Sequence, residues 1–129
     1  RVKTNQERNL TMTTAKERIQ RELQGDLFAR NHPTRSYFRG WLDGSYLGER
    51  HYNYNMGKIR PHVHKSGAAL EKALRPFVIN AFCAYTAHDA QCSYGYAQKV
   101  IVETLDKETL EKLNAALVED AVSLAEEMA

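Results

Sequence analysis

Apolar residues recur every three or four positions in three separate stretches of the chain, which is the period of an amphipathic helix. From Ala15 to Leu27 every fourth residue is apolar, and Thr14 with Glu17 forms a capping box at the start of this stretch. The second stretch has a wide apolar face that contains a proline, and the third follows Asp106, a residue suited to cap a helix. These patterns predict helices over residues 15–29, 67–87 and 107–128.

The segment between the first two helices has a different pattern, in which short runs of aromatic and branched residues alternate with turn residues. Gly44 and Gly57 supply turn chemistry, and Pro61 places the last run at a sheet edge. The expected strands are Tyr37–Leu42, Tyr46–Tyr54 and Lys58–His64, with residues 98–103 as a candidate fourth strand. The sequence therefore predicts an α+β fold, in which a three- to four-stranded antiparallel sheet packs against about three helices.

Length and composition favour one globular domain. Residues 1–12 are polar and lack an apolar period, so they are interpreted as a flexible N-terminal arm, with a single α+β domain over residues 13–129. No apolar run reaches the roughly 18–20 residues of a membrane span, so no membrane association is expected.

Cys83 and Cys92 are interpreted as reduced thiols, which predicts a cytoplasmic protein.

The first part of the chain is basic and the last part is acidic. Residues 1–75 contain fifteen Lys and Arg against seven Asp and Glu, whereas residues 76–129 contain three against nine. A field of one sign raises the local concentration of oppositely charged molecules and steers their association. The expected partner is therefore a nucleic acid, DNA or RNA, or an acidic protein surface.

Basic and aromatic residues are interleaved between residues 35 and 65, which hold half of the aromatic residues of the chain. Single-stranded nucleic acid is bound by this combination, because bases stack on aromatic rings while Lys and Arg neutralise phosphates. The leading hypothesis is a small non-catalytic binding protein whose basic, aromatic-rich surface contacts nucleic acid. The expected contact residues are Arg35, Arg39, Trp41, Arg50, Lys58, Arg60 and His62.

The tyrosines of this segment also have a purely structural interpretation. On an expected strand, Tyr46, Tyr52 and Tyr54 share one face while the opposite face is mostly polar, so the tyrosine face can equally be the core face of the sheet. The core interpretation is weaker for Trp41 than for these tyrosines, and Trp41 is the aromatic residue expected to stack with bases.

Histidines and cysteines raise two chemical alternatives. His62 and His64 would share a strand face and could support acid–base chemistry in a phosphoesterase. Cys83, His88 and Cys92 are candidate zinc ligands, but their spacing lacks the tight ligand pairs of zinc sites. Glycine-rich phosphate loops and known catalytic motifs are absent from the sequence, so no catalytic residue, metal or cofactor is expected.

The run Phe38–Gly44 (FRGWLDG) resembles a fragment of the signature helix of the LAGLIDADG homing endonucleases. That motif packs helix on helix through small residues and ends in an acidic metal ligand. Arg39 stands at a small-residue position, and Ser45 stands where the second acid is expected. The resemblance covers under a tenth of the chain, so the function of that family is not carried over.

The acidic last helix supports an alternative function. Its leucine stripe, over residues 110–128, either packs into the core or forms a helix-pairing seam between subunits of a homo-oligomer. The alternative hypothesis is therefore a protein–protein interaction module, such as an inhibitor or adaptor, which acts through this helix or through the basic face.

Overall fold

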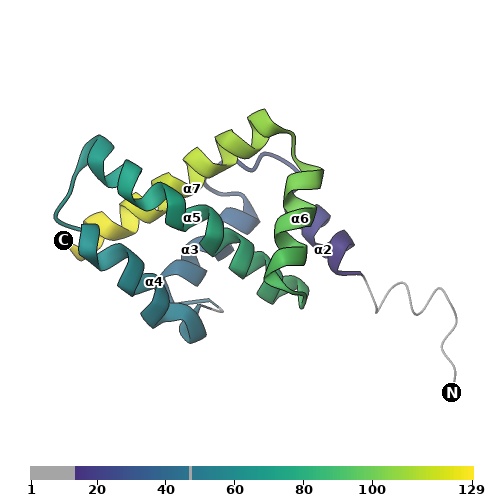
Figure 1. The fold of residues 1–129 in the computed structure, drawn as a ribbon, viewed down its shortest axis with the longest axis horizontal. Coiled ribbons are helices and arrows are strands. Elements are labelled where there is room, and N and C mark those ends of the chain that lie inside the picture. Colours follow the sequence, from purple (N-terminus) through teal and green to yellow (C-terminus); the bar gives the residue numbers. More distant parts are fainter. Residues whose placement is uncertain (1–13, 47) are drawn as a thin grey trace, which may run out of the picture.

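The computed structural model describes residues 14–46 and 48–129, and the regular elements within these ranges are helical (Figure 1). The α+β prediction is wrong, because the described part of the chain contains no strand and no sheet. The expected N-terminal arm, residues 1–12, lies outside the described residues. The elements are α2 (Ala15–Glu22), α3 (Pro33–Asp43), the 3₁₀ turn η1 (Glu49–His51), α4 (Tyr52–Ile59), the 3₁₀ turn η2 (Arg60–His62), α5 (Gly67–Ala90), α6 (Tyr94–Thr104) and α7 (Lys107–Met128).

The first expected strand, residues 37–42, lies inside α3. Pro33 occupies the first turn of this helix, where its missing N–H costs nothing and its fixed φ is already helical. Phe38 and Trp41 are three residues apart and both fully buried, which is the spacing of one helix face. Gly44 ends the helix with a φ of 86°, so it is the C-cap of a helix instead of a hairpin turn.

The remaining expected strands are also helical. Residues 49–62 form η1, α4 and η2 in succession, and residues 98–103 lie within α6. Burial again follows the helical period, since Met56 and Ile59 are buried three positions apart in α4. The turn expected around Gly57 is an exposed position within α4.

The three helices predicted from periodicity are confirmed: α7 has the predicted bounds, α5 ends later than predicted and α2 ends earlier. The first pattern extends beyond α2, because Leu27 is buried in the loop that follows this helix. The helix α5 continues through Pro76 without a break. The helix α7 begins after Asp106, whose carboxylate accepts a hydrogen bond of 2.7 Å from the backbone N–H of Thr109.

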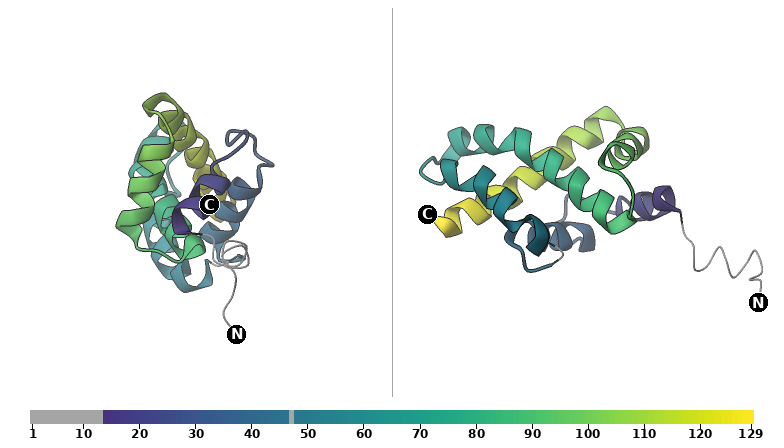
Figure 2. Two further views of the ribbon diagram at one scale, coloured as in Figure 1. Left: turned by 90° about the vertical axis from the view of Figure 1, so that its right-hand side faces the viewer. Right: turned by 60° about the horizontal axis from the view of Figure 1, so that its bottom comes forward.

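The helix α5 is the central element of the fold (Figures 1 and 2). It packs against α2, α3, α4, α6 and α7, and its most extensive contacts are with α7 and α6. The largest buried aromatic side chains come from α3 and α5: Phe38, Trp41, Phe82 and Tyr85. None of the helices in residues 14–46 and 48–129 combines the length and apolarity needed to cross a bilayer.

A buried ion pair joins α3 to α7. Arg35 donates from Nε to Asp120 Oδ2 at 3.0 Å and from Nη2 to Asp120 Oδ1 at 2.9 Å. Its other hydrogen bonds reach the carbonyl oxygens of Phe28, at 2.8 Å, and Ala116, at 3.1 Å. Both charged residues are 2% exposed, so each charge is compensated inside the core.

Replacing Asp120 by alanine is expected to lower the free energy of unfolding by about 3–5 kcal/mol, because Arg35 would remain buried without its counter-charge. Urea unfolding followed by circular dichroism measures the change. The matched control is Glu119→Ala at the exposed neighbouring position, which should alter stability by no more than about 0.5 kcal/mol. Equal losses in the two variants would contradict the structural role of the pair.

Candidate functional site

An aromatic hollow of about 330 Å³ opens between α4 and α5. Its wall combines four rings with two side-chain amides and two alanines, a mixture of apolar surface and a few polar groups that is typical of ligand sites. Tyr54 and Tyr94 are among the large hydrophobic residues that stay exposed. The lining residues are Trp41, His51, Tyr54, Asn55, Asn80, Ala81, Ala84 and Tyr94.

Short-range contacts fix the walls of this hollow. The ring of His51 lies 4.6 Å from that of Trp41, centroid to centroid, and the Asn55 side-chain amide donates to the Trp41 carbonyl at 3.2 Å. Gly48 passes so close that a Cβ at this position would lie 1.8 Å from the same carbonyl oxygen. The segment after α3 is therefore held tightly against the end of that helix.

A second hollow, of about 240 Å³, lies beside the first. The two share Tyr54 and Asn80 as lining residues, and we call the pair of hollows the α4–α5 groove. The second hollow is also lined by Lys58 and His62, and Lys58 Nζ lies 5.5 Å from the centre of the Tyr54 ring. The groove is thus aromatic at one end and basic at the other.

Histidines lie at both ends of the groove. Burial lowers the pKa of His51, and the neighbouring charges of His88 and Arg50 lower it further. The pKa of His62 is lowered by burial and then by Lys65, whose Nζ lies 3.0 Å from His62 Nδ1. Both rings are therefore neutral at neutral pH and can accept a hydrogen bond or stack, while the lysines carry the charge.

The structure brings together three of the seven residues expected to contact nucleic acid. Trp41, Lys58 and His62 line the α4–α5 groove. Arg50 and Arg60 are exposed but line other hollows.

Arg35 and Arg39 are oriented toward α7 instead of the groove. Arg35 is in the buried pair with Asp120, so its guanidinium is not on the surface. Arg39 is partly exposed and lines a third hollow with Arg30.

His51, Asn80 and Tyr94 line the groove but were not among the expected contact residues. If residues 49–59 had been predicted as helical, His51 and Tyr54 would have been placed on one side, three residues apart. Asn80 belongs to α5, and Tyr94 belongs to α6. Their meeting depends on the packing of α6 beside α5, and no local pattern encodes that arrangement.

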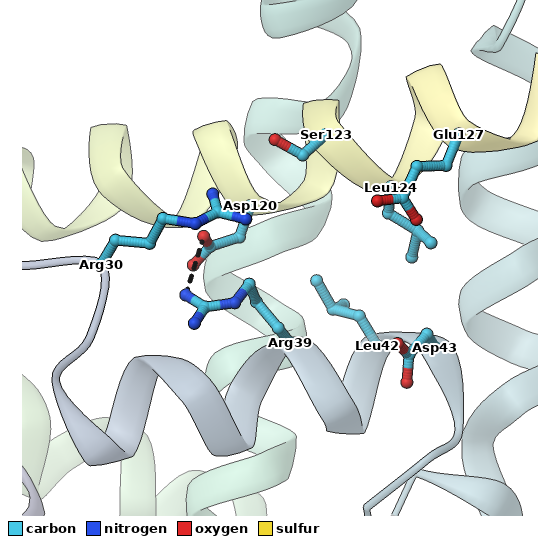
Figure 3. A pocket seen from close by; sticks show the side chains of 8 residues that line it. All are labelled: Arg30, Arg39, Leu42, Asp43, Asp120, Ser123, Leu124 and Glu127. Carbon is cyan, nitrogen blue, oxygen red and sulfur yellow. Dashed lines mark hydrogen bonds and ion pairs between the residues drawn. The ribbon is translucent and has the colours of Figure 1, made fainter.

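The third hollow, of about 190 Å³, lies between α3 and α7, and we call it the α3–α7 cavity (Figure 3). Arg30 and Arg39 lie at one end, beside the buried Asp120, and Arg39 Nη1 is 3.4 Å from Asp120 Oδ1. Two leucines line its middle, and two carboxylates lie at the other end. The lining residues are Arg30, Arg39, Leu42, Asp43, Asp120, Ser123, Leu124 and Glu127.

The residues of the zinc hypothesis and of the phosphoesterase hypothesis do not come together as a site in the described part of the chain. Cys83 is buried, and burial raises the pKa of its thiol to about 11. No group of three metal-ligating side chains converges within residues 14–46 and 48–129. His62 contacts Lys65, and its neighbour His64 is exposed.

The leucine stripe of α7 is largely core. Leu113 and Leu117 are fully buried, and α7 packs most extensively against α5. Both leucines are therefore occupied inside the subunit, and the outward face of α7 carries the acidic residues Glu111, Glu119 and Glu126.

A pair of carboxyl groups joins the end of α2 to the end of α5. Tyr85 donates its hydroxyl to Glu22 Oε1 at 3.3 Å, and the carboxyl group of Asp89 lies nearby. Burial, together with the neighbouring Asp89, raises the pKa of Glu22 to about 9. Glu22 is therefore protonated at neutral pH.

No family model matches the chain, and neither a curated protein nor a solved structure shows a significant match. Function is therefore inferred from the chemistry of the groove and the cavity.

The raised pKa of Glu22 makes folding stability depend on pH. The unfolded chain releases the Glu22 proton above a pKa of 4.5, whereas the folded state keeps it bound. The folding stability that this proton contributes is therefore complete below pH 4.5. It is lost as the pH rises toward about 9. In urea unfolding across this range, the stability of the wild type relative to Glu22→Gln should fall steadily with pH.

Glu17→Gln, at an exposed position on the same helix, is the matched control and should show a constant offset. A constant offset for Glu22→Gln as well would contradict the protonated carboxyl.

Proposed function

We propose that this chain binds single-stranded nucleic acid in the α4–α5 groove. Bases would stack at the aromatic end, and the phosphate backbone would follow the basic end. The observation that carries the proposal is that two neighbouring hollows, one lined by rings and one that contains Lys58, share Tyr54 and Asn80 as lining residues.

The aromatic end supports stacking because two of its four rings are open to a ligand, whereas Trp41, the ring expected to stack with bases, is fully buried. Tyr54 is 59% exposed, and Tyr94 on α6 is 41% exposed, so both present surface that no other part of the described chain covers. Base–aromatic stacking contributes about 1–3 kcal/mol per base and tolerates any sequence. The amide of Asn80, whose oxygen accepts from the Tyr94 hydroxyl at 3.0 Å, keeps its N–H groups for a base edge.

The basic end supports phosphate binding. Lys58 and Lys65 approach it from α4 and from the segment after η2. Lys72 is exposed and lies one helical turn before Pro76, on the same side of α5. The α5 wall of the groove runs from Ala73 to Ala84, which is about 17 Å at the rise of an α-helix, so it can hold a short run of nucleotides.

The two exposed arginines beside α4 do not line the groove. Arg50 precedes α4 and Arg60 follows it, and each lines another hollow, so neither is part of the proposed phosphate-binding surface. Arg35 takes no part in the proposed interface because its donors are used in the core.

Binding is tested with a fluorescently labelled single-stranded oligonucleotide, titrated at several salt concentrations. Tyr54→Ala should weaken binding by about 1–3 kcal/mol with an unchanged salt dependence, because it removes a stacking surface and no charge. Lys58→Gln should weaken binding and reduce the slope of log K against log salt by about 1, because one phosphate contact is lost.

Lys107→Gln, an exposed lysine at the start of α7, is the control and should leave affinity and slope unchanged. Trp41 is the single tryptophan of the chain and lines the groove, so its fluorescence reports occupancy independently. Absence of binding at low salt, or equal effects of all three substitutions, would refute the proposal.

A further inference from the structure

The α3–α7 cavity has opposite charges at its two ends, which makes it chemically distinct from the α4–α5 groove. Arg30 and Arg39 lie at one end, and Asp43 with Glu127 lies at the other (Figure 3). The side chains of Leu42 and Leu124 lie between the two ends and provide an apolar floor. A ligand that fills the cavity must therefore carry an anionic group and a cationic group separated by an apolar chain.

The cationic end has unused capacity for an anion. Asp120 already receives two short hydrogen bonds from Arg35, and its contact with Arg39 is a longer one of 3.4 Å. A guanidinium carries five donors, and within the described residues this is the one hydrogen bond that Arg39 makes. Ser123 lines the same cavity and offers a hydroxyl. A carboxylate suits this end because guanidinium groups bind it with two parallel hydrogen bonds.

The acidic end lies one helical turn away on both walls. Asp43 follows Arg39 by four residues on α3, and Glu127 follows Ser123 by four residues on α7. Four residues correspond to about 6 Å of helix rise, which is comparable to the length of an extended lysine side chain. A short ligand such as glycine cannot reach both ends.

We propose that the α3–α7 cavity binds a C-terminal lysine of a polypeptide. Its terminal carboxylate lies between Arg30 and Arg39, its aliphatic stem lies on Leu42 and Leu124, and its ammonium group lies between Asp43 and Glu127. Free lysine shares the carboxylate and the side-chain ammonium but carries a second ammonium group beside the carboxylate. The two arginines repel that group, so free lysine binds more weakly than a peptide, in which the same nitrogen is a neutral amide.

The probes are 6-aminohexanoate, which has a carboxylate and an ammonium group at the two ends of an aliphatic chain, with hexanoate and hexylamine as its matched one-charge controls. Heteronuclear NMR titration of the whole chain follows the backbone amides of Ser123 and Leu124. We expect shifts at these amides with 6-aminohexanoate, and affinities at least tenfold weaker for hexanoate and hexylamine, because each lacks one charge-assisted contact. Equal binding of hexanoate would overturn the proposal in favour of a simple anion site.

A peptide that ends in lysine is then compared with its C-terminal amide and with free lysine. The acid form should bind at least tenfold more tightly than the amide, because the amide has lost the negative charge. It should also bind more tightly than free lysine. Equal affinities for the acid and the amide would exclude recognition of the chain terminus, and tighter binding of free lysine would identify the free amino acid as the ligand and overturn the polypeptide assignment.

Two substitutions locate the site. Glu127→Gln should weaken 6-aminohexanoate at least tenfold but leave hexanoate unchanged, and Arg39→Gln should weaken both. Their matched controls are Glu126→Gln, an exposed neighbour outside the cavity, and Arg60→Gln, an exposed arginine of η2.

Thermal unfolding verifies that each variant is folded. If Arg39→Gln unfolds, Ser123→Ala replaces it, with weaker binding of both compounds expected. Unchanged affinity in Glu127→Gln would refute the acidic end of the site whatever the arginine variants show.

Discussion

The ion pair between Arg35 and Asp120 constrains the packing of α3 more than any other single interaction. It joins positions 85 residues apart in the sequence, and the same guanidinium also reaches the carbonyl oxygens of Phe28 and Ala116. An unpaired charge in this environment is strongly unfavourable, so α3 cannot rotate or slide along α7 without a large cost in free energy. The orientation of α3 then decides which of its residues face α5 and which face α7.

Consecutive residues of α3 consequently serve different parts of the molecule. Trp41 faces α5 and lines the α4–α5 groove, whereas Leu42 lines the α3–α7 cavity. Gly48 and Asn55 both contact the Trp41 carbonyl, so the segment after α3 is fixed to the same helix end. One buried salt bridge therefore positions the walls of both candidate sites, and its Asp120 also lines the α3–α7 cavity.

The sequence contained clear signals for the long helices and misleading ones for residues 36–64. Apolar spacing and caps located α5 and α7, because long amphipathic stripes have few alternative interpretations. The aromatic content of residues 37–54 favoured strands, yet Phe38 and Trp41 also fit a helical face, and tertiary packing selected the helix. Gly44 provided a left-handed backbone in both interpretations, so it could not distinguish a helix cap from a hairpin turn.

The same limits applied to the candidate sites. Lys58 and His62 could be selected from charge and residue type, because such side chains stay near the surface in almost any fold. Arg35 could not be distinguished from them, since its partner comes from the acidic helix and a pair so distant in sequence leaves no local pattern. Some of the opposite charges of the two halves of the chain therefore pair with each other inside the protein, where Asp120 compensates Arg35 and contacts Arg39. Of the exposed cations in α4 and η2, Lys58 lines the α4–α5 groove and Arg60 lines another hollow, so the basic surface at the groove is smaller than the sequence predicts.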